Sequence, residues 1–239
     1  MSDIVDLHCH LLPKIDDGSD SINTSIEMIK RLSSQGIKNI FCTSHGDYVA
    51  FDVDAYKNKF IQFRNMMRII VPDINLYCGA EVYCDENVEE VIEQLKKGSQ
   101  LTLNDSKYVL TEFYIDVVPE EILFDVKSII EEGFIPIIAH IERYSLIFDG
   151  KTIDKLIEMG ALIQVNAYSY GEGITSEFGQ NALQLLPKKQ VHFLGSDAHN
   201  ISWRAPLMKK GINYLKDNLD REFFEDITKN NALKYLKID

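Results

Sequence analysis

Two histidines, His8 and His10, are separated by one residue and follow the first apolar run of the chain, Ile4 to Leu7. Side chains alternate between the two faces of a β-strand, so His8 and His10 point the same way and Cys9 points the opposite way. Two imidazoles on one face of a strand end can bind a single metal ion. This pair alone is weak evidence, and its weight depends on what the later strands carry.

Residues that can bind a metal also end most of the other predicted strands. The strands are predicted at 4–7, 39–44, 75–82, 108–113, 135–139, 162–167 and 191–196. In a closed parallel barrel the carboxyl ends of all strands converge on one rim, where active sites form. The candidate metal ligands are His8, His10, Asp17, His45, Glu81, Glu112, His140, Asp197 and His199.

This set of candidates is too large for one ion. Metal sites of this kind use three to six ligands, so five imidazoles and four carboxylates indicate two or three ions. Mixed nitrogen and oxygen ligands without a thiolate favour manganese, iron or zinc, and we expect Cys9 not to be a ligand. The remaining histidine, His192, has the opposite parity to Asp197 and His199 on its strand, which predicts a structural role.

Helical patterns alternate with the short β-branched runs along the whole chain. A first helix, capped by Ser21 or Asn23, is predicted to run to 34. Further helices are predicted at 55–70, 85–97, 119–133, 152–159, 203–216 and 221–236, and another ends before Pro187. This alternation predicts an α/β fold with a parallel sheet or barrel. A length of 239 residues suits one barrel domain, which we expect to span 1–239.

Bulk composition narrows the classes of partner and compartment. The chain is 45% hydrophobic and 26% charged, as expected for a globular protein, and its formal charge of −12 argues against nucleic acid as a partner. No apolar run approaches the roughly 18 residues of a membrane-spanning helix, so we expect no membrane insertion. The start of the chain has no basic-then-apolar signal pattern, and the four cysteines form no CxxC pair. Both observations favour a cytoplasmic location with reduced thiols.

Clustered divalent ions indicate a hydrolytic reaction. Such ions lower the pKa of a bridging water and stabilise the entering and leaving oxygens, which suits phosphoester hydrolysis. Amide or lactone hydrolysis would use the same equipment. Arg143 and Arg204 lie just beyond two strand ends, where a guanidinium can bind phosphate oxygens. The alternative for Arg143 is an ordinary surface ion pair with Glu142 or Asp149.

Seven short motifs contain the candidate ligands and arrive in a recognisable order: Asp6–His10, Asp16–Gly18, Thr43–His45, Gly79–Glu81, Thr111–Phe113, Ala139–Tyr144 and Gly195–Asn200. By these motifs the sequence resembles the polymerase-and-histidinol-phosphatase (PHP) superfamily over essentially its whole length. Within that superfamily it is most similar to the bacterial tyrosine-protein phosphatases of capsule and exopolysaccharide clusters.

The resemblance implies a distorted (β/α)7 TIM-like barrel with three divalent metal ions, typically manganese. The first ion would take His8, His10, Glu81 and Asp197; the second Glu81, Glu112 and His140; the third Asp17, His45 and His199. Asp16 is the fallback for Asp17. Arg143 and Arg204 match the phosphate-contacting arginines of the family. The implied partner is a phosphotyrosine protein, the tail of a tyrosine kinase that controls polysaccharide export.

We expect a metal-bound hydroxide to attack phosphorus, with Asp197 or His199 as the candidate proton donor. Two alternatives stay open: a small-molecule phosphatase acting on histidinol phosphate or a nucleotide, and an idle metal-binding scaffold that docks on a kinase. The loop at 46–52 and the stretch at 82–85 lack the basic residues common in the family. Six aromatic residues on predicted rim loops are either stacking partners for a phosphotyrosine ring or loop anchors: Tyr48, Phe51, Tyr83, Tyr114, Tyr168 and Tyr170.

Overall fold

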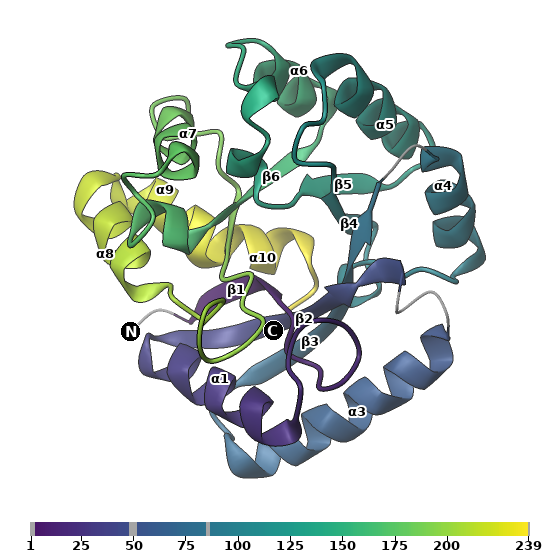
Figure 1. The fold of residues 1–239 in the computed structure, drawn as a ribbon, viewed down its shortest axis with the longest axis vertical. Helices are drawn as coiled ribbons and strands as arrows, with labels where there is room; N and C mark the ends of the chain where they lie inside the picture. Colours follow the sequence, from purple (N-terminus) through teal and green to yellow (C-terminus); the bar gives the residue numbers. More distant parts are fainter. Residues whose placement is uncertain (1–2, 48–51, 85–86, 239) are drawn as a thin grey trace.

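Seven parallel strands form one sheet in which every strand pairs with its neighbours in sequence. The computed structural model describes residues 3–47, 52–84 and 87–238. The strand order β1-β2-β3-β4-β5-β6-β7 wraps the sheet into a barrel with helices outside it (Figure 1). The strands are β1 (Ile4–Cys9), β2 (Ile37–His45), β3 (Asn75–Tyr83), β4 (Tyr108–Glu112), β5 (Ile135–Ile138), β6 (Leu162–Asn166) and β7 (Phe193–Gly195).

The barrel closes between β1 and the residues that follow β7. The Asp197 amide donates to the His8 carbonyl at 2.7 Å, and the His10 amide donates to the Ala198 carbonyl at 2.9 Å. These bonds tie the first histidine pair directly to the last predicted ligand segment. The seven predicted strands are all present, and β7 is shorter than the predicted 191–196.

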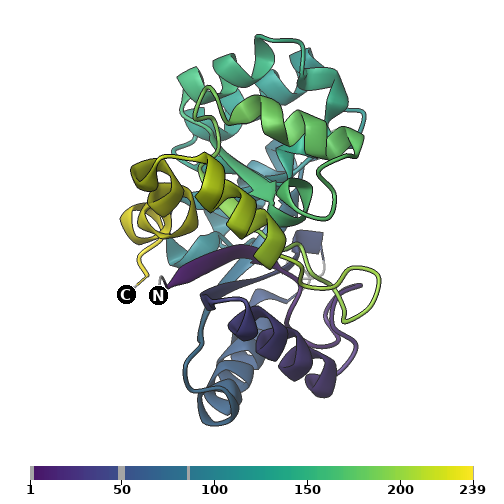
Figure 2. The same ribbon diagram turned by 90° about the vertical axis from the view of Figure 1, so that its left-hand side faces the viewer.

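The helices mostly follow the predicted positions. Ser21 caps the helix that begins at Ile22 by accepting from the Thr24 amide, and Gly98 ends the helix Val88–Lys97 in a left-handed conformation. The helices are α1 (Ile22–Ser34), α3 (Val53–Ile70), α4 (Val88–Lys97), α5 (Pro119–Glu131), α6 (Thr152–Met159), α7 (Glu177–Leu185), α8 (Lys209–Asn218), α9 (Arg221–Glu225) and α10 (Asn231–Tyr235). Figure 2 shows the C-terminal helices beside β1.

Two helix predictions were wrong in detail. Residues 203–208 are not helical, because Pro206 disfavours helical backbone before it and Asn200 accepts the Arg204 amide in a turn. The last predicted helix contains a π-helical turn at Asp226–Asn230 between α9 and α10. The predicted start of a helix at Asp85 lies outside the described residues.

The barrel interior is apolar at one end and polar at the other. Phe41, Leu110 and Phe193 belong to the interior apolar cluster, which also contains Leu236 near the end of the chain. Because inward-facing positions recur every second residue, the same faces of β2, β4 and the β7 segment continue to His45, Glu112 and Asp197. The apolar layer therefore supports a polar layer at the carboxyl ends of the strands.

A register shift in β1 adjusts how the first histidines face this layer. Asp6 pairs with Ile40 and Cys9 with Cys42, so three residue steps in β1 oppose two in β2. Leu7 lies in the interior apolar cluster, whereas Cys9 is buried in the outer cluster between sheet and helices. Cys9 thus faces away from the histidines, as predicted.

One close backbone approach holds the rim segment after β6. Gly211 in α8 is packed so tightly on Ala167 that an added Cβ would overlap the Ala167 carbonyl group. Ala167 opens the short 3₁₀ helix Ala167–Tyr170, which follows Asn166 at the end of β6. Only glycine permits this distance between α8 and the rim.

We predict that Gly211→Ala lowers the free energy of unfolding by about 1–3 kcal/mol, the usual cost of overpacking a filled site. Chemical denaturation monitored by circular dichroism measures this loss. Asn213→Ala is the matched control, because Asn213 is an exposed residue of the same helix. Equal stability of Gly211→Ala and the control would contradict the close approach.

Candidate metal centre

The structure brings all nine predicted metal ligands together at the carboxyl end of the barrel. Among the described residues, the side chains close enough to share an ion form four overlapping groups that contain these nine residues and no others. The groups are His8, His10 and Asp197; His8, Glu81 and His140; His45, Glu81 and Glu112; and His10, Asp17, His45 and His199.

Glu81 occupies the middle of the cluster and faces two groups at once. Its Oε2 atom lies 3.1 Å from Nε2 of both His8 and His10, and the two ring nitrogens are themselves 3.1 Å apart. Its Oε1 atom lies 3.0 Å from His140 Nε2. One carboxylate can therefore bridge two ions, one held with His8 and His10 and the other with His140.

A third group lies on the more exposed side of the centre. Asp17 Oδ1 is 3.3 Å from both His45 Nε2 and His199 Nε2, and the His10 and His199 rings stack with centroids 3.7 Å apart. Among the described residues, no hydrogen-bond partner is found for the buried His199 Nε2 atom. A divalent cation between this buried nitrogen and the Asp17 carboxylate would satisfy both groups.

The pKa values of two histidines in the cluster are shifted in opposite directions. Burial opposes protonation of His10, yet hydrogen bonds and charge from Asp16 and Glu81 raise its pKa to about 10. Burial and the neighbouring His10 lower the pKa of His199 to about 2, so this ring is neutral, the form that binds metals. The raised pKa of His10 means that a positive charge beside Asp16 and Glu81 is favoured. Bound divalent ions would supply that charge in place of the proton, so the donor set fits a metal centre.

Further side chains hold the ligands in orientation. Asp16 Oδ2 lies 2.9 Å from His10 Nδ1 and accepts the His45 amide at 2.9 Å, so Asp16 supports the centre and does not join the four groups. Gln164 Oε1 lies 3.2 Å from His8 Nδ1 and accepts the His140 amide at 2.9 Å. Partners on the far nitrogen fix which nitrogen faces the metal. Sequence reasoning missed Gln164, although its parity with Asn166 on β6 was a signal.

The two predicted phosphate-contacting arginines both bind Asp197. Arg143 Nη2 donates to Asp197 Oδ2, and Arg204 Nη2 donates to Asp197 Oδ1 at 2.8 Å. Burial opposes ionisation of Asp197, but positive charge from His8, Arg143 and Arg204 holds its pKa far below the usual range. The surface pairing of Arg143 with Glu142 or Asp149 is not found. Glu142 is buried and accepts from the Asn166 amide and the Ser169 hydroxyl.

Two ligand candidates have unusual backbone conformations. His140 has a φ of 31° and Asp197 has a φ of 52°. Both values lie in the left-handed region, which residues other than glycine seldom adopt. Such strain persists only where surrounding contacts enforce it. The β5 and β7 ends are therefore bent to direct these two side chains into the centre.

A cavity of about 320 Å³ opens beside Asp197 and the two arginines, and Tyr168 lines it. Of the other predicted rim aromatics, Tyr170 is a buried anchor that donates to the Ala182 carbonyl, and Tyr83 packs edge-on against Tyr114. Tyr48 and Phe51 lie outside the described residues. His192 also lies outside all four groups, and its Nδ1 accepts the Ile163 amide at 3.1 Å.

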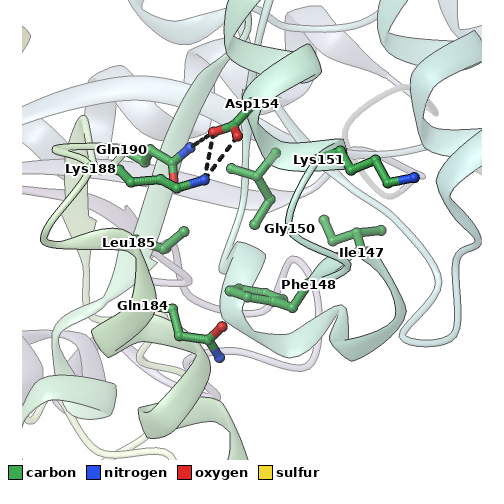
Figure 3. A pocket seen from close by; sticks show the side chains of 10 residues that line it. Ile147, Phe148, Gly150, Lys151, Asp154, Gln184, Leu185, Lys188 and Gln190 are labelled. Atoms are coloured by element: carbon green, nitrogen blue, oxygen red, sulfur yellow. Dashed lines mark hydrogen bonds and ion pairs between the residues drawn. The ribbon is translucent and has the colours of Figure 1, made fainter.

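A second cavity, of about 150 Å³, lies between α6 and α7 (Figure 3). Its polar wall is Asp154, which accepts from Lys188 and Gln190. None of the nine candidate ligands lines it. The cavity beside Asp197, in contrast, is lined by one of the nine candidate ligands and by both arginines.

A seven-stranded parallel barrel with a rim of convergent histidines and carboxylates defines the class of metal-dependent β/α-barrel proteins. A solved structure of similar fold, the phosphotriesterase homology protein from Escherichia coli complexed with phosphate in its active site, matches with a TM-score of 0.66. The two chains are 12% identical, and the match covers 98% of each. This likeness shows the fold alone.

Closer relatives identify the family. The model of the family described as "Capsular polysaccharide synthesis, CpsB/CapC" matches residues 4–237, and the chain belongs to this family. Tyrosine-protein phosphatase YwqE of Bacillus subtilis (strain 168) is 32% identical over 96% of this chain and 91% of its own length. Tyrosine-protein phosphatase CpsB of Streptococcus pneumoniae is 31% identical over 89% of each.

A solved structure agrees with this assignment. A chain from the crystal structures of YwqE from B. subtilis and CpsB from S. pneumoniae, described as unique metal-dependent tyrosine phosphatases, matches with a TM-score of 0.86. It is 29% identical and covers 98% of this chain and 94% of its own. The predicted family resemblance and barrel fold are therefore confirmed.

We predict that Asp16→Asn weakens metal binding about ten- to a hundredfold, because the amide no longer fixes the His10 ring as a carboxylate does. Calorimetric titration of the metal-free protein with Mn²⁺ measures the affinity. Asp116→Asn is the control, since Asp116 is an exposed carboxylate on the loop after β4. Unchanged affinity in Asp16→Asn would show that Asp16 does not support the centre.

Proposed function

We propose that this protein is a metal-dependent protein-tyrosine phosphatase that hydrolyses the phosphate monoester of phosphotyrosine. The observation that carries the proposal is the placement of Arg143 and Arg204 on the two oxygens of Asp197, which itself belongs to one of the four ligand groups. Two guanidiniums next to a metal centre suit a dianionic phosphate. The names of the relatives support the same activity.

The proposed metal ligands are the nine residues of the four groups, and three divalent ions, manganese first, are the proposed cofactors. The absence of a thiolate among the donors supports manganese or iron over a structural zinc site. When bound, such ions would lower the pKa of a water nucleophile and neutralise charge on the phosphate. Cys9 takes no part, because it lies in the outer apolar cluster.

The protein's own groups position the substrate. Arg143 and Arg204 bind the non-bridging phosphate oxygens, and Asp197 orients both guanidiniums. Positive charge around Asp197 and burial of His199 lower the pKa values of these two candidate proton donors, which disfavours the protonated form of each. A tyrosine phenolate, with a pKa of about 10, needs less acid assistance than an alkoxide. The structure thus favours departure of the phenolate without protonation by either group.

The proposed partner is a phosphotyrosine protein, the tail of a tyrosine kinase that regulates capsule or exopolysaccharide export in the cytoplasm. The family is described by its part in capsular polysaccharide synthesis, which supports a role in capsule export. Among the described residues, no helix combines the length and apolar composition that crossing a bilayer requires. A net charge of −12 makes nucleic acid a poor partner.

The direct test measures phosphate release from a phosphotyrosine peptide, with histidinol phosphate as the comparison substrate. We predict that Mn²⁺-loaded protein prefers the peptide, that EDTA abolishes the activity and that Mn²⁺ restores it. Alkylation with N-ethylmaleimide is expected to leave activity unchanged, because no cysteine is a ligand or nucleophile.

Three outcomes would contradict parts of this proposal. Activity that survives thorough metal removal would exclude the metal-dependent reaction. Preference for histidinol phosphate would retain the hydrolysis and reject the protein substrate. An absence of turnover on both substrates with metal bound would favour the docking scaffold.

A further inference from the structure

The cavity beside Asp197 is lined by both charged and apolar side chains, which we call its charged wall and its apolar wall. Arg143 and Arg204 stand on the charged wall, where they bond to Asp197. The apolar wall includes Tyr168, Trp203 and Leu207. A molecule that carries a phosphate on one end and an apolar group on the other matches this division.

Trp203 is unusually exposed for its type. Its exposed fraction is 79%, and it is the single tryptophan of the chain. Large aromatic side chains normally bury much of their area, and an exposed one at the wall of a cavity marks a binding surface. Folding alone does not account for this position, because Trp203 buries little of its ring.

The turn that carries Trp203 is well defined. Asn200 Oδ1 accepts the amides of Ser202 at 3.0 Å and Arg204 at 3.1 Å, on either side of Trp203. The Arg204 guanidinium lies 5.8 Å from the centre of the indole ring, within range of a cation–π contact. The same guanidinium bonds to Asp197, so the indole and the phosphate-binding wall are coupled through Arg204.

Tyr168 is also held in position while its ring stays accessible. Its exposed fraction is 45%, and its carbonyl accepts the amide of Gly173 at 2.9 Å. An added Cβ at Gly173 would lie only 2.6 Å from the Tyr168 ring, so the ring rests directly against this glycine. The buried carboxylate of Glu142 accepts from residues on both sides, Asn166 and Ser169. Tyr168 therefore presents a fixed aromatic surface to the cavity.

We infer that Trp203 and Tyr168 bind the aromatic ring of the phosphotyrosine side chain and determine a preference for aryl over alkyl phosphates. The inference rests on the proposed phosphatase activity and adds the residues that select the substrate. With the phosphate on Arg143 and Arg204, the ring of an aryl ester extends along the apolar wall. Phosphoserine or another alkyl phosphate has no group to cover these aromatic faces.

The kinetic test compares phenyl phosphate with O-phosphoserine on the Mn²⁺-loaded full chain. Trp203→Ala is expected to lower kcat/KM for phenyl phosphate about tenfold more than kcat/KM for O-phosphoserine, mainly through KM. Trp203→Phe should recover most of the loss, because it restores an aromatic face. Phe124→Ala is the matched control: Phe124 is 58% exposed on α5 and does not line this cavity.

A second readout does not depend on turnover. Because Trp203 is the single tryptophan, its fluorescence reports directly on this wall. Titration with phenylphosphonate is expected to shift or quench the emission, and methylphosphonate, which has no ring, should leave it nearly unchanged. Tyr168→Ala should weaken the phenylphosphonate response about tenfold in apparent affinity.

The two readouts separate the failure of this inference from failure of the proposed activity. Equal losses on both substrates in Trp203→Ala, or no loss on either, would overturn the ring-binding role while phosphate release still supports a phosphatase. Identical fluorescence responses to both phosphonates would also overturn it. A ring-specific fluorescence response in a protein without turnover would support the aryl site and reject the phosphatase activity.

Discussion

The candidate centre depends on one electrostatic constraint: carboxylates removed from water must be balanced by positive charge. Glu81 is 1% exposed, and burial by itself would favour its neutral form. The surrounding imidazoles of His8, His10 and His140 reverse this effect and hold its pKa well below the usual range. Uncompensated buried charge is among the most destabilising features a fold can contain. Divalent ions between these groups would resolve the imbalance, because each ion replaces a proton on an imidazole and attracts the carboxylates.

The barrel makes this convergence possible. Parallel strands bring their carboxyl ends to one rim. The apolar cluster fills the barrel interior below this rim, so the polar side chains gather at the rim itself. The two strained positions, His140 and Asp197, occur where a strand must turn inward to reach the centre. The strained backbone at these two positions lowers stability but orients the two side chains, as is usual at functional sites.

Much of this arrangement was predictable because strand parity and strand ends are local properties. His8 and His10 follow an apolar run, and Asp197 and His199 follow another, so their shared orientation follows from the sequence. The supporting contacts were not predictable in the same way. Gln164 contacts His8 across the barrel, and Asp16 contacts both the His10 ring and the His45 amide. These contacts join residues from different elements of the fold, and no local sequence pattern predicts them.

The Trp203 turn illustrates the remaining limit of sequence reasoning. Helical spacing predicted a helix from 203, whereas Pro206 and the side chain of Asn200 impose a turn. That turn places an aromatic residue beside the two arginines. The sequence contains no lysine or arginine at 46–52 or 82–85. Aromatic contacts with the substrate ring then contribute to recognition where charge contributes less.

The central claim is that the nine convergent side chains bind a cluster of divalent ions. Anomalous diffraction from crystals of the Mn²⁺-loaded protein, collected at the manganese edge, tests it most directly. We expect separate peaks within the cluster, with at least one peak on each side of the Glu81 carboxylate. A single peak elsewhere on the molecule, or no peak at the carboxyl end of the barrel, would contradict it.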